Sequence, residues 1–307
     1  MQEYSAGIEL ATETVRAYGL VKAGEDVSVS QVGTGYVNRV FKAVASDGRC
    51  YAVRLPDRLT EESLENEDAI IKQLSTSNLR TATLLRNKNG IFYKNGRGET
   101  ATVSLWLSGQ HPLHNVNAPL CSALGKALAT FHVVVRELPH LNSGQLLSPD
   151  AKGWLEANLQ ISGSIVEKLR QRALNFDSKN LPVGIVHGDF HANNILIDAQ
   201  TIAILDFERA GQSVLLLDIA RAVADLCSTA DGGFDDSRLA AFLSGYESIR
   251  ALTYAEYNML GLAIIYAALA VANWFHIQEE KIWAGHFLDV GWSVYRSPAL
   301  ALSPRKE

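Results

Sequence analysis

Cysteine is scarce in this sequence. The 307 residues contain three, Cys50, Cys121 and Cys227, and their scattered positions show no metal-ligand spacing. Such usage suits small hydrophobic side chains in a reducing compartment. The first residues also lack a basic stretch followed by an apolar core, so no signal peptide is expected. Together these absences predict a cytoplasmic location.

Clustered positive charge, long apolar runs and one common phosphate-binding motif are also absent. The formal net charge is −5 and no cluster of Lys and Arg occurs, which argues against a general nucleic-acid binder. The longest apolar run, residues 260–272, is too short to span a bilayer and is expected to form a buried helix. No Gly-Lys-Ser or Gly-Lys-Thr occurs, which excludes a Walker A loop. We therefore expect neither nucleic acid nor membrane as a partner.

The first third of the chain alternates strand-like runs with turns. Residues rich in Val, Tyr and Phe are bounded by turn residues, a pattern typical of antiparallel strands. Thr60 precedes acidic residues and a helical spacing of apolar residues, which predicts a helix start. We expect strands at residues 27–32, 39–45, 50–55, 91–93 and 100–107, and helices at 9–18 and 60–74.

After Gly109 the pattern becomes helical. The expected helices cover residues 118–135, 151–174, 215–227, 237–248 and 254–277. The only strong strand signals here form one hairpin after Asn194. The whole pattern predicts an α+β fold with two lobes. Residues 1–107 form an N-lobe of antiparallel sheet plus helix, and residues 108–307 form a mostly helical C-lobe.

The segment from Ile185 to Asn194, followed by Asp206, carries the strongest functional signal. Two short β-branched runs around a polar turn separate Asn194 from Asp206, which predicts a hairpin. The two ends of a hairpin meet, so the Asn194 and Asp206 side chains are expected to lie together. An amide and a carboxylate oxygen suit Mg²⁺, whose remaining ligands are water and substrate phosphates. This predicts a phosphate-transfer site.

Asp189 lies just before this hairpin, where its carboxylate is expected to act as a general base toward a hydroxyl. Taken alone, a loop Asp most often caps a turn. Its spacing from Asn194 and Asp206 favours the catalytic interpretation, because protein kinases use the same division of labour. His187 is expected to orient the loop. His191 either contacts phosphate or faces solvent, and the sequence leaves both open.

The N-lobe offers a glycine-rich loop between two strands, formed by Gly33, Thr34, Gly35 and, at its end, Asn38. Glycines let backbone amides approach phosphates closely. The alternative is a simple hairpin turn, which is the more common role of such a loop. We expect the loop to cover the nucleotide phosphates.

Arg54 is expected on the third strand, where protein kinases carry a Lys over the α- and β-phosphates. A guanidinium can grip phosphate oxygens with two hydrogen bonds. Glu67 shares the apolar side of the next helix, so it should point inward and need a cation. We expect it to pair with Arg54, with Glu65 as the second choice. A purely structural ion pair is the alternative.

The remaining candidates border the expected nucleotide and substrate positions. Backbone groups around Ser104 and Trp106 are expected to contact the adenine. Asp225 could bind a substrate ammonium group, although a solvated helix Asp is an equal alternative. Glu208 and Arg209 could also meet the substrate. Asp218 is expected to play a structural role.

These residues resemble the aminoglycoside phosphotransferase and choline kinase superfamily over nearly the whole chain, and look most like type II homoserine kinases. The resemblance implies ATP, Mg²⁺ and a small amine-bearing acceptor whose hydroxyl is phosphorylated. It is carried by His187-Gly188-Asp189, Asn194, Ile204-Leu205-Asp206-Phe207 and Leu217-Asp218-Ile219-Ala220, and by the runs 101–109, 121–132, 223–227 and 234–254.

Some positions depart from the homoserine kinase pattern. Gly188 stands where that pattern favours Ala, and Ala224 where it favours Asn. Glu208-Arg209-Ala210 replaces a Tyr-Phe-Ala sequence, while Arg54 resembles the choline kinase branch. Two alternatives therefore stay open: an aminoglycoside or choline-type kinase, and a nucleotide-binding pseudokinase that acts as a regulator. The absence of a dense acidic run near the site favours a small acceptor over a large polycation.

Overall fold

The protein is described from a computed structural model that covers residues 2–22, 24–32, 38–56, 60–88, 90–113, 116–139, 141, 146–199 and 201–297. By contacts, the chain divides into two compact units. Unit 1 contains Met1–Gly109 and Ala203–Glu208, and unit 2 contains Gln110–Ile202 and Arg209–Glu307. The division into functional lobes at residue 107 stays a prediction.

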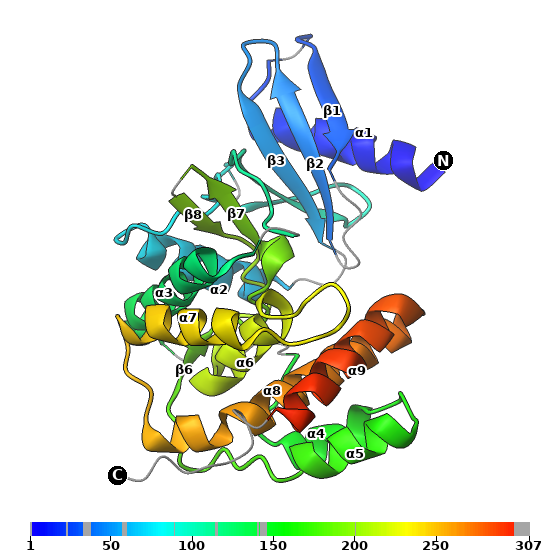
Figure 1. Cartoon of the computed structure of the whole chain (residues 1–307). Coiled ribbons are helices and arrows are strands. Elements are labelled where there is room, and N and C mark those ends of the chain that lie inside the picture. Colours follow the sequence, from blue (N-terminus) through cyan, green and yellow to red (C-terminus); the bar gives the residue numbers. More distant parts are fainter. Residues whose placement is uncertain are drawn as a thin grey trace. The chain divides into compact units, whose positions relative to one another are not determined.

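Unit 1 is built on a five-stranded antiparallel sheet with the strand order β1-β2-β3-β5-β4 (Figure 1). Inward and outward positions alternate along β2 and β3, as expected for a sheet with one covered face. The register places Val40 opposite Arg54. The strands are β1 (Val27–Gln31), β2 (Asn38–Ala45), β3 (Cys50–Pro56), β4 (Phe92–Lys94) and β5 (Thr100–Leu105).

Two helices complete unit 1. Helix α1 (Gln2–Ala17) packs across β1, β2, β3 and β5, and its buried face joins the hydrophobic core of the sheet, which includes Phe41 and Val53. Helix α2 (Glu61–Leu74) begins at Thr60, whose side chain forms a reciprocal capping box with Ser63. Glu67 lies on the buried side of α2 and is 4% exposed.

Unit 2 is mostly helical and contains two short two-stranded elements. One is the antiparallel pair of β6 (Val183–Val186) and β9 (Gly211–Val214), and the other is the hairpin of β7 (Ile195–Asp198) with β8 (Thr201–Ile204), whose last residues belong to unit 1. The helices are α3 (Ala118–Val134), α4 (Ala151–Asn158), α5 (Ser164–Ala173), α6 (Leu215–Leu226), α7 (Asp236–Glu247), α8 (Tyr254–Ile277) and α9 (Lys281–Arg296).

Helix α8 is the core helix of unit 2. Residues 260–272 are all buried, which confirms the expected buried helix. Within the described part of the chain, two helices are long and apolar enough to cross a membrane by length and composition alone, Ala118–Glu137 and Tyr254–Ile277. About three quarters of the most apolar window of α8, 78%, is buried inside the protein, as in the core helix of a globular unit.

The sequence-based helix over residues 151–174 is wrong in one respect. The structure has two helices, α4 and α5, separated at Gly163, whose φ of +142° is a conformation open to glycine. Strands β6 and β9 and helix α9 were not predicted. The two strands have four residues each, too few for a clear periodicity.

Helices α3 and α7 lie side by side and cross at a pair of glycines (Figure 1). A Cβ atom at Gly245 would lie 1.9 Å from the Ser122 carbonyl oxygen, and one at Gly125 would lie 2.0 Å from the Phe242 carbonyl oxygen. Neither backbone oxygen can move without shifting a helix. The crossing therefore depends on the absence of a side chain at both positions.

Gly245→Ala is expected to lower the free energy of unfolding by about 1–3 kcal/mol, because a methyl group is forced into a closed helix crossing. Urea unfolding measures the change. Gly285→Ala, in α9, is the matched control, because a Cβ there meets no atom within 4 Å. It should leave stability unchanged or raise it by about 0.5–1 kcal/mol. Equal effects of the two substitutions would contradict the close crossing.

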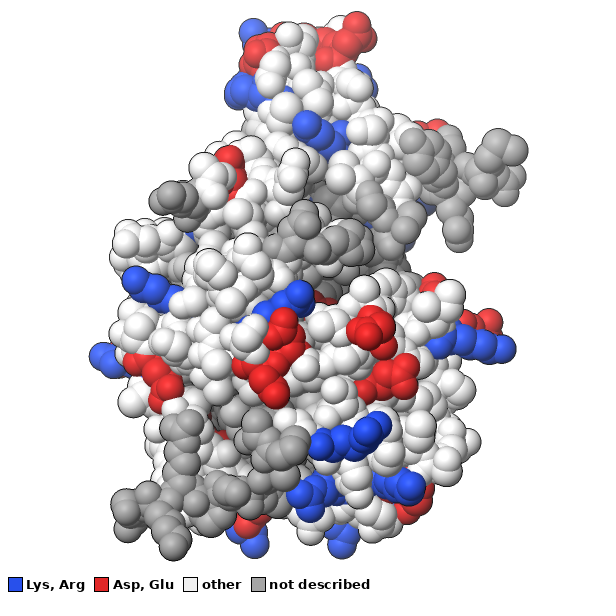
Figure 2. Space-filling view, viewed as in Figure 1, with Lys and Arg blue, Asp and Glu red and all other residues white. Residues whose placement is uncertain are grey.

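The charged side chains are interspersed on the face that Figure 2 shows. Among the described residues on that face, both signs of charge occur, and neither Lys and Arg nor Asp and Glu cover it as one continuous patch.

Candidate active site

The loop between β6 and β7 carries Asp189 and ends in a short 3₁₀ helix, Ala192–Asn194. The Asn194 side-chain amide donates from Nδ2 to the Asp189 carbonyl oxygen at 3.0 Å. This bond fixes the amide orientation, so the Asn194 side-chain oxygen is the atom that can bind a cation. The loop thus presents a carboxylate and an amide oxygen from adjoining positions.

The Asp189 carboxylate is held by a positive side chain that the sequence analysis did not single out. Arg221, on α6, donates from Nε to Asp189 Oδ1 at 2.9 Å. The His191 Nε2 atom lies 3.6 Å from the other carboxylate oxygen. Burial raises the pKa of Asp189, but the charges of His191 and Arg221 outweigh it and hold the pKa well below its usual range. Asp189 is therefore ionised.

Asp218 anchors the backbone of this loop. Its carboxylate accepts hydrogen bonds from the backbone N–H groups of His187 at 2.7 Å and Gly188 at 3.0 Å. Asp218 is 2% exposed. Burial raises its pKa, but hydrogen bonding and the charges around it hold the pKa below its usual value. The expected structural role of Asp218 is thus to fix the two residues that precede Asp189.

A chain of buried hydrogen bonds extends from Asp218 into the helices. The carboxylate must accept, so His132 donates from Nε2 at 2.9 Å. The other His132 nitrogen then accepts from the Tyr246 hydroxyl at 2.7 Å, and Arg250 donates to that hydroxyl at 3.1 Å. Arg250 also donates to Glu256, at the start of α8, at 2.9 Å. Three helices thereby brace the Asp189 loop.

Gly188 needs to be glycine in this chain. Its φ is +80°, and a Cβ atom there would lie 2.3 Å from the Arg209 carbonyl oxygen. An L side chain would meet both backbone strain and a backbone clash. The Gly188 departure from the homoserine kinase pattern is thus a requirement of this loop conformation.

Unit 1 brings Arg54, Glu67 and Asp206 together. Arg54 donates to the Glu67 carboxylate, and its second terminal nitrogen lies 3.5 Å from Asp206 Oδ1. The expected Arg54–Glu67 pair is therefore present, while Glu65 is exposed. Burial lowers the pKa of Arg54, but the charges of Glu67 and Asp206 outweigh it and raise the pKa. Arg54 thus carries a permanent positive charge.

Asp206 has two unusual features. Its φ is +64°, an uncommon value for a residue other than glycine and one that clusters at functional sites. Its Oδ1 atom is buried and accepts no hydrogen bond from the described residues. A buried carboxylate oxygen with only an ion-pair partner at 3.5 Å has room in its coordination for a cation.

The structure describes some of the other residues that were expected to bind the nucleotide. Asn38 donates to Glu208 at 2.8 Å, and its own side-chain oxygen is buried without a hydrogen-bond partner among the described residues. Ser104 lies within β5, paired with β3. The backbone N–H of Trp106 donates to the Cys50 carbonyl oxygen at 3.1 Å, so this backbone donor is already engaged. Gly33, Thr34 and Gly35 lie outside the described residues.

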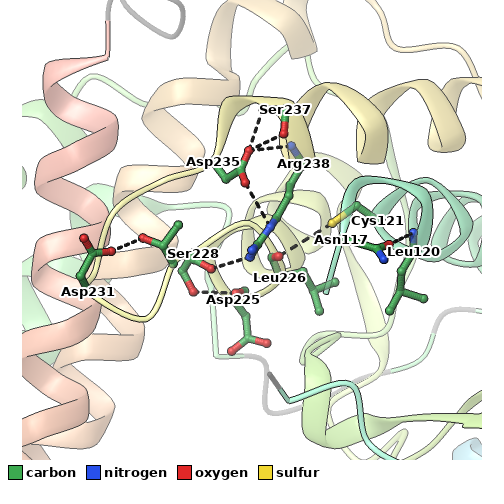
Figure 3. Close-up of polar contacts among 11 residues, drawn as sticks. Asn117, Leu120, Cys121, Asp225, Leu226, Ser228, Asp231, Asp235, Ser237 and Arg238 are labelled. Atoms are coloured by element: carbon green, nitrogen blue, oxygen red, sulfur yellow. Dashed lines mark hydrogen bonds and ion pairs between the residues drawn. The ribbon is translucent and has the colours of Figure 1, made fainter. Parts of the chain in front are cut away.

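Asp225 lies at the end of α6 and contacts the Asp189 loop. Its Oδ2 atom accepts from the Ala192 N–H at 2.9 Å. Figure 3 shows its carboxylate pointing away from the Asp235–Arg238 pair of α7. Arg238 instead donates to the Ser228 carbonyl at 2.9 Å, which ties the segment after α6 to α7. Asp225 is therefore bonded to the Asp189 loop and does not form an ion pair with Arg238.

Comparison with known protein families identifies the family of this chain. The model of the APH family, described as "Phosphotransferase enzyme family", matches residues 28–252. The chain belongs to this family. The match includes the Asp189 loop, the hairpin and α6, so the suspected family is confirmed. The protein is an enzyme, a small-molecule kinase.

Curated relatives include homoserine kinases. That of Methylobacillus glycogenes is 26% identical over 288 residues, covering 90% of this chain and 88% of that protein. That of Gluconobacter oxydans (strain 621H) is 25% identical over 291 residues, covering 89% and 92%.

Solved structures share the fold. A microcompartment-associated aminopropanol kinase matches with a TM-score of 0.72 at 16% identity, covering 96% of this chain and 100% of that one. An amicoumacin kinase in complex with AMP-PNP, Ca²⁺ and Ami matches with a TM-score of 0.69 at 16% identity, covering 90% of each chain. The expected α+β, protein-kinase-like fold is confirmed.

Asp218→Asn is expected to lower the free energy of unfolding by about 3 kcal/mol near neutral pH, because it removes a buried charge to which His187, Gly188 and His132 donate. The pKa of Asp218 is lowered in the folded protein, so its stabilisation is fully present above the unfolded pKa of about 3.9. It is lost as the pH falls toward the folded value. Urea unfolding at about pH 7 and about pH 3 should therefore show a smaller difference from wild type at the lower pH. A difference that grows on acidification would contradict this assignment.

Proposed function

We propose that this small-molecule kinase transfers the terminal phosphoryl group of ATP to a hydroxyl group of a small amine-bearing metabolite, with Mg²⁺. The observation that carries the proposal is the Asp189 carboxylate. It is ionised, bonded to Arg221 and fixed on a loop that Asp218 anchors. A phosphotransferase needs such a group to orient the acceptor hydroxyl.

The nucleotide role falls to unit 1. Arg54 keeps its charge and is oriented by Glu67, so its guanidinium suits the α- and β-phosphates. Asn38 begins β2 directly after the glycine-rich loop, whose proposed contact with the phosphates rests on sequence. Ser104 and Trp106 are proposed near the adenine, where the Trp106 contact would use its carbonyl rather than its engaged N–H.

The donor set fits Mg²⁺. Asp206 offers a buried carboxylate oxygen without a hydrogen bond, and the Asn194 amide is turned so that its oxygen is available. Asn194 directly precedes β7, and Asp206 follows β8 by two residues, so the hairpin joins the two proposed ligands. Hard oxygen ligands of this kind suit Mg²⁺. Bound there, Mg²⁺ would neutralise charge on the phosphates.

Asp189 performs the chemistry of the acceptor. Its carboxylate accepts a hydrogen bond from the acceptor hydroxyl and aims that oxygen at the terminal phosphorus of ATP. The new phosphorus–oxygen bond forms as the bond to the departing ADP oxygen breaks, and the hydroxyl proton passes to Asp189 and then to solvent. Because the pKa of Asp189 is lowered, it orients the hydroxyl and takes the proton late, as fits a loose transition state.

The acceptor is proposed to be small and amine-bearing. Asp225 bonds to the Ala192 N–H of the Asp189 loop, His191 lies 3.6 Å from Asp189, and Glu208 carries a further carboxylate in unit 1. Relatives named for homoserine and aminopropanol kinases support acceptors of this size. A coupled ADP-release screen of amino alcohols, including homoserine, choline and hydroxylysine, and of aminoglycosides tests the proposal. Turnover that requires no acceptor alcohol would contradict it and favour a regulatory nucleotide binder.

Asp189→Asn is expected to lower kcat by about 10²- to 10⁴-fold, because the amide cannot take the proton. Steady-state kinetics with ATP and the best acceptor measure the loss. The pKa of Asp189 is lowered. Protonation of Asp189 should therefore not reduce the wild-type kcat at any pH near or above 3.9, about the ordinary pKa of an Asp. Wild-type turnover in the variant would refute the assignment of the base.

Asp206→Asn is expected to weaken Mn²⁺ binding by roughly 10-fold or more in the presence of a nonhydrolysable ATP analogue, because a charged ligand is removed. Electron paramagnetic resonance of free Mn²⁺ measures the affinity independently of turnover. Asp26→Asn, an exposed residue before β1, is the control and should bind as wild type does. Unchanged affinity in Asp206→Asn would exclude it as a metal ligand.

A further inference from the structure

A small cavity lies within unit 2, beside the turn that precedes Asp189. Its volume is about 10 Å³. A cavity holds a water molecule from roughly 10–15 Å³ upwards, so this one has room for a single water and for nothing larger. A water also needs polar partners, because cavities with purely apolar walls stay dry. The walls are formed by Leu147, Val186, Gly188, Ser213, Leu217 and Asp218.

Strand β9 places the Ser213 side chain on the face that carries the cavity. Ser213 lies opposite Gly184 and Gly211 lies opposite Val186, so the Ser213 and Val186 side chains share one face of the β6–β9 pair. Both residues line the cavity. Ser213 is 3% exposed, and its Oγ atom is buried without a hydrogen-bond partner in the described part of the chain.

A buried hydroxyl without a partner is costly, because it has lost the hydrogen bonds that water gives it in the unfolded chain. Native proteins satisfy nearly all such groups, with ordered water where no protein atom is within reach. The unpaired Ser213 hydroxyl at the cavity wall therefore points to a bound water as its partner.

Asp218 supplies the second polar group. A carboxylate offers about four acceptor positions. Among the residues that the structure describes, three donors use them: the His187 N–H and His132 Nε2 bond to Oδ2, and the Gly188 N–H bonds to Oδ1. Oδ1 thus keeps one position. It is the oxygen on the Gly188 side, and Gly188 lines the cavity together with Asp218.

The two polar groups do not bond to each other directly, since Ser213 Oγ has no protein partner among the described residues. Polar groups that are too far apart for a direct bond are commonly joined by one water. Such a bridge would satisfy the hydroxyl and would give the buried carboxylate a further donor.

We propose that the cavity is a binding site for one internal water, which accepts a hydrogen bond from Ser213 Oγ and donates one to Asp218 Oδ1. Ser213 is then a positioning residue. Through the water it fills the last acceptor position of the carboxylate that fixes the His187 and Gly188 N–H groups before Asp189. The inference does not depend on the proposed function, because it concerns neither nucleotide nor acceptor.

A high-resolution crystal structure of the wild-type protein tests the site directly. One water peak is expected at a hydrogen-bond distance of about 2.5–3.0 Å from both Ser213 Oγ and Asp218 Oδ1. The proposal is overturned if no peak is found there or if Ser213 Oγ donates directly to a protein atom. A metal ion with several oxygen ligands at this position would overturn it as well.

Ser213→Thr and Ser213→Val form a matched pair, because both new side chains are β-branched and only Thr keeps the hydroxyl. Hydrogen–deuterium exchange measured by mass spectrometry reports on the His187 and Gly188 N–H groups. Ser213→Val should speed their exchange by about 2- to 10-fold, the range for one hydrogen bond. Ser213→Thr should exchange as wild type does.

Two controls separate this local effect from a general loss of stability. The amides of residues 260–272, in the buried helix α8, should exchange as in wild type in both variants. Ser30→Val, at an exposed position of β1, should leave the His187 and Gly188 amides unchanged. Equal exchange in the Thr and Val variants would refute the role of the hydroxyl, as would one common factor at residues 187–188 and in α8. If neither variant folds, the wild-type crystal structure decides.

Discussion

The buried Asp218 carboxylate is the contact on which the conformation of the Asp189 loop depends. It accepts the backbone N–H groups of His187 and Gly188 and the ring N–H of His132, and it does so at 2% exposure. These two backbone N–H groups lie at the turn directly before Asp189. One carboxylate from α6 supplies their partner and also starts the hydrogen-bond chain through Tyr246 to Arg250. The position of Asp189, the proposed base, is therefore set by the packing of helices far apart in sequence.

Both units contain a buried ion pair between an arginine and one or more carboxylates. Each places a guanidinium against carboxylates in a buried setting, Arg54 with Glu67 and Asp206, and Arg221 with Asp189. In each case the opposite charge keeps the group ionised against the cost of burial. A phosphotransferase benefits, because fixed charges need no reorganisation when phosphate charge moves. The pairs serve orientation more than stability, since burying charge gains little free energy.

Much of the fold follows from local patterns. The turn residues and β-branched runs predicted the strands of the N-terminal sheet to within one or two residues, and Thr60 marked the start of α2 through its own cap. The pairing of Arg54 with Glu67 was also predictable, because an acidic residue on an apolar helix face needs a cation. The break at Gly163 and the four-residue strands β6 and β9 were missed, since apolar content alone does not separate short strands from helix.

The sequence by itself determined the chemistry. His-Gly-Asp with Asn five residues after the Asp, a hairpin and a second Asp before Phe carry the family, because the spacing of a motif survives where the surroundings change. Only the tertiary structure decided what surrounds Asp189. Arg221, His132 and Tyr246 lie on helices remote in sequence, and no local spacing links them to the loop. Which polar atoms lack a hydrogen-bond partner among the described residues, such as Arg221 Nη1, depends on the packed neighbours and cannot be read from the sequence.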